Sequence, residues 1–133
     1  HDFEAMRLDP PADHVFLATM GPVSTHTARA GFATNLLAAG GVAVDPAGAT
    51  DDVAQVLEAY DGQRVACLAG TDPTYAAWGG ELVTALRGAG ATWVIVAGVS
   101  TSPTGDLFET VDDACALGVD ALDFLRRTRE KLA

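Results

Sequence analysis

Three short runs of almost purely apolar residues, each ending at a glycine, constrain the fold of this chain more than any other feature. The runs are residues 15–20, 64–69 and 93–97, and the glycines that follow them are Gly21, Gly70 and Gly98. Strands of this kind are buried on both faces, as the inner strands of a parallel sheet are. The sequence therefore predicts a parallel sheet with these three runs at its centre.

Segments with helical periodicity lie between the strands. Residues 28–39 repeat small and apolar side chains at i, i+3, i+4 and i+7, and stop at Gly40 and Gly41. A second helix is expected to open at Thr50 as its N-cap, and a third covers residues 73–86. The remaining expected elements are a strand at 42–44, a helix at 107–117, a strand at 119–122 and a tail helix at 123–133.

Strands and helices thus alternate about five times, which is typical of α/β proteins whose parallel sheet is covered by helices on both faces. At 133 residues the chain has room for one such domain. The best topology is a flavodoxin-like, doubly wound sheet of five strands in the order 2-1-3-4-5. Ligands of these sheets bind beyond the carboxyl ends of the strands, beside strand one, which here is an expected loop at 21–27.

Charge and hydropathy exclude two classes of partner. The chain has 18 acidic and 8 basic residues, a formal charge of −10, and Lys131 is its single lysine. Nucleic acids and anionic membranes both attract a basic surface, so neither is expected as a partner. No apolar run reaches the roughly 18 residues of a membrane span, and residues 1–10 lack the pattern of a signal peptide. Cys67 and Cys115 lie in apolar runs and are expected to be buried free thiols of a cytoplasmic protein.

The start of the chain has the composition of a linker. It begins at His1 rather than at a methionine, and it contains the consecutive prolines Pro10 and Pro11. Domain boundaries usually fall in polar, proline-rich segments of this kind. We therefore expect residues 1–13 to be the end of an interdomain linker and residues 14–133 to be the folded domain.

Two familiar users of this fold differ from the chain at their functional positions. A phosphoacceptor receiver needs an aspartate at the end of strand three and a lysine at the end of strand five, and the chain has neither. A flavodoxin needs a phosphate loop rich in hydroxyls and glycines. Residues 24–27 supply hydroxyls, but residues 28–30 supply no glycine, and a helix start capped by Ser or Thr explains the same pattern. A flavin or phosphate ligand stays open only as a distant alternative.

A third user of the fold is matched along most of the chain. Residues 15–21, the histidine-bearing segment after them and residues 38–42 follow the first βαβ unit of the cobalamin-binding domain of methylmalonyl-CoA mutase and related adenosylcobalamin mutases. Residues 81–90 resemble the third helix of that family, and residues 93–98 resemble its fourth strand. The resemblance implies the same flavodoxin-like fold, of the cobalamin-binding-domain type.

The functional motif of that family is altered here. Its cobalamin-binding members carry Asp-x-His-x-x-Gly after strand one, in which the histidine is the lower cobalt ligand and the aspartate orients it. The matching residues are Ser24, His26 and Arg29, so the histidine is kept while the carboxylate and the glycine are lost. In the family, a Ser-x-Leu after strand three and a glycine-rich stretch after strand five line the slot for the nucleotide tail of the cofactor. Residues 69–71 and 122–126 stand at those places, and the latter segment carries bulky and charged side chains instead of glycines.

This combination resembles the small, or β, subunit of heterodimeric methylmalonyl-CoA mutase. The resemblance implies a C-terminal domain that is structural and non-catalytic, that binds no cofactor, and whose partner is the large subunit. It places adenosylcobalamin elsewhere in a complex that interconverts methylmalonyl-CoA and succinyl-CoA. No catalytic residue is expected in the chain, and the acidic pair Asp51 and Asp52 fits a helix start better than acid–base chemistry. The alternative is a functional cobalamin-binding module that uses His26 as the lower cobalt ligand.

Overall fold

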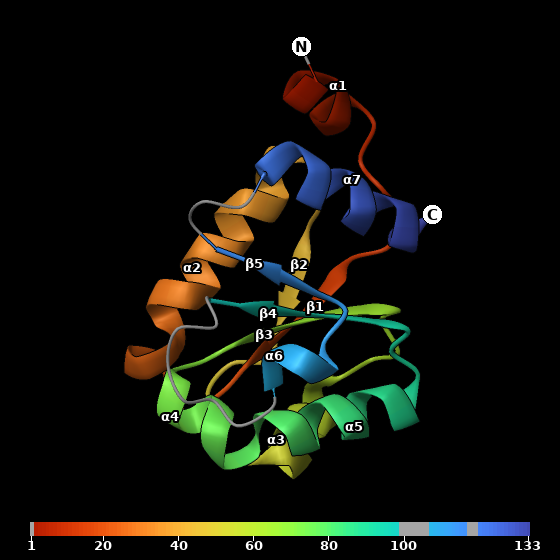
Figure 1. Cartoon of the computed structure of the whole chain (residues 1–133). Helices are drawn as coiled ribbons and strands as arrows, with labels where there is room; N and C mark the ends of the chain where they lie inside the picture. Colours follow the sequence, from red (N-terminus) through yellow and green to blue (C-terminus); the bar gives the residue numbers. More distant parts are fainter. Residues whose placement is uncertain (1, 99–106, 117–119) are drawn as a thin grey trace.

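The protein forms a five-stranded, fully parallel sheet. The computed structural model describes residues 2–98, 107–116 and 120–133. In chain order the strands are β1 (Val15–Thr19), β2 (Val44–Pro46), β3 (Val65–Ala69), β4 (Trp93–Ala97) and β5 (Asp113–Cys115). They lie in the order β2-β1-β3-β4-β5, and every neighbouring pair is parallel (Figure 1). The predicted flavodoxin-like α/β fold and its strand order are confirmed.

The three central strands are the ones that the sequence predicts. Every residue of β1 and β3 is buried, and in β4 only Trp93 is partly exposed. Val15 lies beside Val65, and Val65 lies beside Trp93, so the amino ends of the three strands are level. Their continuous apolar runs are explained by the helices that cover both faces of the sheet.

Two helical layers cover the sheet, each with its own apolar cluster (Figure 1). One layer contains α1 (Asp2–Leu8), α2 (Val23–Ala39) and α7 (Ala121–Leu132). The other contains α3 (Val53–Ala59), α4 (Asp72–Thr74), the π-helical turn η1 (Tyr75–Gly79), α5 (Gly80–Ala89) and α6 (Leu107–Thr110). Side chains alternate along β1, so that Leu17 joins the first cluster and Phe16 the second. Among the described helices, none combines the length and the apolar character that a bilayer span requires.

Helix α2 begins earlier than its apolar pattern predicts. Residues 22–27, expected as a loop, are its N-cap and its first turn. Gly21 turns the chain with a φ of +83°, and Pro22, with φ near −62°, leads directly into the helix. The N–H groups of Thr25 and His26 then donate to the carbonyl oxygen of Pro22, at 3.0 and 3.3 Å. The loop prediction was wrong because residues 23–30 contain neither proline nor glycine, so nothing in this segment breaks a helix.

The second strand and the second helix begin later than predicted. Val42 donates its N–H to a carbonyl in the last turn of α2, at 2.9 Å, so β2 begins only at Val44. The N-cap of α3 is Asp52 and not Thr50. The buried Thr50 hydroxyl instead donates to the carbonyl oxygen of Thr19 at the end of β1, at 2.8 Å. Thr50 does not cap α3, because its hydroxyl instead bonds the segment between β2 and α3 to the end of β1.

The fifth strand lies earlier in the chain than predicted. It is Asp113–Cys115 and not residues 119–122. Of the predicted strand, Val119 lies outside the described residues, and the others are the N-cap and the first turn of α7. The side chain of Asp120 accepts the N–H of Asp123 at 3.1 Å, a capping bond that fixes the start of a helix. The strand prediction was wrong because this cap determines the local structure.

The helix expected at 107–117 is much shorter. Within the described part of this range, α6 ends after one turn, at Thr110. The carboxylate of Asp112 then accepts the N–H of Val94 on β4 at 2.8 Å, and the guanidinium of Arg87 lies 3.1 Å from the same carboxylate. These contacts bring the chain to the edge of the sheet, where it continues as β5.

The residues expected as the end of a linker include a helix. Helix α1 occupies Asp2–Leu8, and its Phe3 and Met6 pack against the first apolar cluster. The prolines Pro10 and Pro11 follow, in positions where they prevent the helix from continuing. In Figure 1 this helix lies above α7 and the end of α2, on the side that faces away from the sheet.

Candidate functional site

The carboxyl ends of the central strands form one edge of the sheet. The strand order reverses between β1 and β3, which is where ligands of doubly wound sheets bind. Helices α2 and α4 begin at this edge, shortly after Gly21 and Gly70. The predicted site residues Ser24, His26 and Arg29 all lie in the first two turns of α2. The fold therefore places all three beside the expected crevice.

His26 faces the protein interior. Its exposed fraction is 5%, and its ring Nδ1 lies 3.1 Å from the carbonyl oxygen of Gly21. Because a carbonyl oxygen only accepts, Nδ1 carries the proton, and the lone pair of the neutral ring is on Nε2. A backbone carbonyl therefore orients this imidazole, and Nε2 is the atom that is able to ligate a metal.

Ser24 does not support the His26 ring. The Ser24 side chain is exposed, and residues two positions apart on a helix do not face each other. The hydrogen bond that orients the imidazole comes from Gly21 instead. The structure therefore does not bring Ser24 and His26 together as a ligand and its supporting group.

Arg29, one turn further along α2, crosses the carboxyl edge of the sheet. Its Nη1 donates to the carbonyl oxygen of Gly70 at 3.0 Å and lies 2.8 Å from Oδ1 of Asp72. The guanidinium carbon lies 5.2 Å from the centre of the Tyr75 ring. A Cβ atom on Gly98 would lie 3.0 Å from the same guanidinium carbon, so this glycine leaves room for it. Arg29 thus reaches from α2 across the ends of β3 and β4.

Tyr75, predicted only to lie on the inward face of a helix, also bonds to the ends of two strands. The side chain is buried, and its hydroxyl accepts the N–H of Gly70 at 3.1 Å and donates to the carbonyl oxygen of Ala97 at 2.6 Å. It thereby joins the ends of β3 and β4. Burial raises the pKa of the Tyr75 phenol above its ordinary value. The available signal was the position of this tyrosine, two residues after the helix-opening Pro73.

The cavity that the described residues line at this edge is small. A cavity of about 240 Å³ lies beside Arg29, and its other lining residues are Thr25, Ala28, Gly70, Thr71 and Asp72. Pockets for drug-sized ligands usually measure about 300–1,000 Å³. Larger hollows, of about 360 and 430 Å³, lie near Asp13 and Arg64 at the opposite, amino-terminal end of the strands. The predicted crevice is therefore narrowed by side chains of the protein itself.

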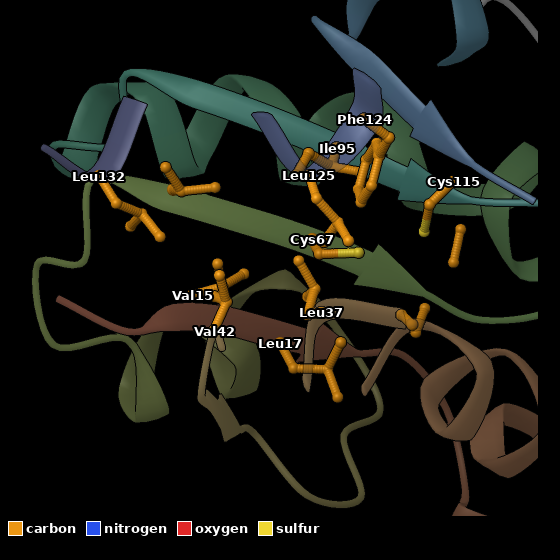
Figure 2. Packing of buried hydrophobic residues seen from close by; sticks show 14 residues of the cluster. Val15, Leu17, Leu37, Val42, Cys67, Ile95, Cys115, Phe124, Leu125 and Leu132 are labelled. Atoms are coloured by element: carbon orange, nitrogen blue, oxygen red, sulfur yellow. The ribbon is translucent and has the colours of Figure 1, made fainter. Parts of the chain in front are cut away.

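The segment 122–126, predicted to replace a glycine-rich stretch, is the first part of α7. Phe124 and Leu125 are fully buried in the first apolar cluster. Figure 2 shows both side chains lying over the sheet, in the neighbourhood of Ile95. A Cβ atom on Gly40, at the end of α2, would lie 2.7 Å from Cδ2 of Leu125, so α7 and α2 are in direct contact.

The two cysteines are buried free thiols, as predicted. The neighbouring Cys115 thiol and burial both raise the pKa of the Cys67 thiol. Within residues 2–98, 107–116 and 120–133, no group of three or more His, Cys, Asp or Glu side chains is arranged to hold a metal ion. Among the three predicted site residues, only His26 has a side chain that commonly ligates a metal, so it is the candidate ligand.

Comparison with known proteins identifies relatives of this chain. No model of a known protein family matches it. It is 38% identical over 120 residues to the methylmalonyl-CoA mutase small subunit of Streptomyces virginiae, a match that covers 89% of this chain and 18% of the relative. It is 33% identical over 121 residues to the probable methylmalonyl-CoA mutase small subunits of Mycobacterium bovis and Mycobacterium tuberculosis, covering 89% of this chain and 19% of each relative. The chain thus spans about a fifth of the length of these relatives. Over 89% of its length it is homologous to one segment of methylmalonyl-CoA mutase small subunits, as the sequence resemblance predicted.

Proposed function

We propose that this chain is the C-terminal, cobalamin-binding-like domain of a methylmalonyl-CoA mutase small subunit, and that its role is structural. The names of its relatives support the assignment to a small subunit. In this proposal the partner is the large subunit of a cytoplasmic heterodimer, which carries adenosylcobalamin and interconverts methylmalonyl-CoA and succinyl-CoA. The domain itself binds no cofactor and contributes no catalytic residue. The observation that carries this second part is the position of Arg29.

Arg29 stands where the cobalamin-binding motif of the family has a glycine. A corrin that approached His26 from the solvent side of the crevice would meet the guanidinium, which is already bonded to Gly70 and Asp72. Displacing Arg29 would break its ion pair with Asp72 and its hydrogen bond to the Gly70 carbonyl, and a hydrogen bond to a charged group contributes about 1.5–3 kcal/mol. Contacts within the domain therefore hold Arg29 in the crevice.

The packing of α7 supports the same conclusion. By the family resemblance, residues 122–126 stand where a glycine-rich stretch lines the slot for the nucleotide tail. Here Phe124 and Leu125 fill that place and are fully buried. Exposing one such side chain costs about 1.5–3 kcal/mol of hydrophobic free energy. A nucleotide tail in this place would have to displace both.

The residues at the His26 site do not fit cobalamin as the family binds it. The position of the orienting carboxylate is taken by Ser24, whose side chain is exposed and points away from His26. A neutral carbonyl, that of Gly21, holds the imidazole in place of the carboxylate that supports a ligating histidine. We therefore assign no step of the mutase reaction to this domain.

Deletion of the domain tests the structural role. The full small subunit is co-expressed with the large subunit, with and without the segment that corresponds to this chain. We expect the deletion to lower both the yield of heterodimer and the mutase activity, because a partner that binds only the folded form stabilises it by mass action. A matched control is Ser24→Ala, which changes an exposed side chain and is expected to alter neither quantity. Equal heterodimer yield and equal activity after the deletion would refute the structural role.

One observation favours the alternative, a cobalamin-binding module with His26 as the lower cobalt ligand. The hydrogen bond from Nδ1 to the Gly21 carbonyl leaves the lone pair on Nε2, which is the tautomer that a metal ligand requires. His26 therefore keeps one of the properties of the ligand even though its other supports are absent.

Titration with hydroxocobalamin separates the two proposals. We expect the corrin absorption bands to stay unchanged when the purified protein is added to micromolar cobalamin, because Arg29 and α7 occupy the site. The matched variants are His26→Ala and His14→Ala, the latter changing an exposed histidine that lies 2.9 Å from Asp45. A spectral change that His14→Ala retains and His26→Ala abolishes would establish the alternative.

A further inference from the structure

The first residues of the chain form an arm against the ends of α2 and α7 (Figure 1). We define the arm as residues 2–9, which are α1 and the residue that follows it. No residue of α1 is fully buried. An isolated helix as short as α1 is unstable in water, so the arm depends on its contacts with the rest of the domain.

Arg129 on α7 supplies the main polar contacts of the arm. Its Nη1 donates to the carbonyl oxygens of Met6, at 3.1 Å, and of Gly40, at 2.7 Å. Its Nη2 donates to the carbonyl oxygen of Asp9 at 2.6 Å. The Met6 and Gly40 carbonyls are at the C-terminal ends of α1 and α2, where partial negative charge favours a cation. One guanidinium, with a side chain only 19% exposed, therefore joins three segments of the chain.

Gly41 shapes the surface on which the arm lies. Its φ is +76°, and a Cβ atom in this position would lie 2.5 Å from the carbonyl oxygen of Met6. The side chains of Phe3 and Met6 pack beside it, against the first apolar cluster. The close approach of α1 to the end of α2 thus requires a glycine at this point.

Two further polar contacts of the arm are weaker. Arg126 pairs with Asp2 at 3.2 Å, but both side chains are more than half exposed, and exposed pairs contribute little to stability. Arg7 reaches the carbonyl oxygen of Ala39 only at 3.4 Å. Beyond the arm, Arg64 bonds to Asp13 and to the carbonyl of Leu132, so the chain is held again where β1 begins.

From this arrangement we infer that Arg129 is a latch for a detachable arm. Breaking its hydrogen bonds to Met6 and Asp9 releases residues 2–9, while the sheet, α2, α7 and the second helical layer stay folded. The core of the sheet does not depend on the arm, because β1, β3 and β4 are buried by α2, α5 and α7. The latch therefore controls whether residues 2–9 lie against the domain, and this property is independent of the proposed function.

Tryptic cleavage after Arg7 tests the latch in the full chain. Arg7 lies inside α1, and a protease acts on the locally opened form of such a segment. In Arg129→Gln we expect cleavage after Arg7 to accelerate about tenfold or more, because hydrogen bonds to a charged group are lost. Cleavage after Arg87, inside α5, is expected to keep its wild-type rate. Mass spectrometry of the fragments over time gives both rates.

Arg126→Gln is the matched control, since it removes a neighbouring arginine whose pair with Asp2 is exposed. We expect it to leave cleavage after Arg7 near the wild-type rate. If Arg129→Gln accelerates cleavage after Arg87 as much as after Arg7, the residue stabilises the whole domain and the latch is refuted. Unchanged rates at both sites would refute it equally.

Gly41→Ala provides a second route to the same result should Arg129→Gln fail to accumulate. The added methyl group would collide with the Met6 carbonyl, so the arm is displaced while Arg129 is kept. We expect selective acceleration of cleavage after Arg7 again. Equal acceleration after Arg7 and Arg87, or none, would overturn the inference.

Discussion

Replacement of Phe124 by alanine is expected to lower the free energy of unfolding by about 3–5 kcal/mol, the usual cost of removing a buried aromatic ring. Phe124 is fully buried on the first turn of α7, among side chains of the sheet and of α2 (Figure 2). The change leaves a cavity that the surrounding helices close only in part. Urea denaturation followed by circular dichroism measures the effect at neutral pH.

The matched control for this prediction is Leu8→Ala. Leu8 is also a large apolar residue on a helix, but 79% of it is exposed, and we expect a change within about 0.5 kcal/mol. A loss below about 1 kcal/mol for Phe124→Ala would mean that α7 is packed loosely on the sheet. Such a result would also remove the argument that this helix fills the place of a cofactor tail.

The central strands could be predicted because their physical environment leaves a plain trace in the sequence. A strand buried on both faces must be apolar at each position, and β1, β3 and β4 meet this condition almost throughout. The glycine after each run marks the point where the chain turns away from the sheet. The strand order then followed from the alternation of strands and helices.

The edge strands could not be predicted in the same way. Strand β5 is three residues long and begins with Asp113, whose carboxylate is paired with Arg127 at 2.9 Å. Its place is determined by contacts with β4, such as the bond from Val94 to Asp112, which link positions far apart in the sequence. The segment 119–122 has the composition of a strand, but the Asp120 cap overrides this local preference.

At the candidate site, the sequence predicted which residues depart from a cobalamin motif but not what they do instead. The bulk of Arg29 was evident, whereas its partners lie in residues 70–75, more than forty positions along the chain, and depend on the fold. The burial of His26 also escaped prediction, because residues 22–27 were expected to be a loop. The carbonyl of Gly21 carries no side-chain signal at all, so its hydrogen bond to His26 required the structure.

Replacement of Tyr75 by phenylalanine is expected to cost about 1–3 kcal/mol, because it leaves a buried N–H and a buried carbonyl without their partner. These groups belong to Gly70 and Ala97, at the ends of β3 and β4. Urea denaturation near neutral pH measures the loss. The matched control is Tyr60→Phe, which removes a hydroxyl that donates to the Gln63 carbonyl at 2.6 Å in a half-buried place, and a smaller loss is expected.

The wild type and Tyr75→Phe also differ in how their free energy of unfolding responds to alkaline pH. Burial raises the pKa of Tyr75 in the folded state, whereas an unfolded tyrosine titrates near about pH 10. Above that pH the unfolded chain binds fewer protons than the folded one, so the stability contributed by the protonated phenol is lost as the pH rises. Tyr75→Phe lacks this loss, and the difference in stability between the wild type and the variant narrows by up to about 1.4 kcal/mol per pH unit. Since Tyr60 and Cys67, whose pKa values are also raised, remain in both proteins, the difference isolates Tyr75. A difference that stays constant from about pH 9 to about pH 11 would show that the Tyr75 phenol titrates at its ordinary pKa and is not held by the ends of β3 and β4.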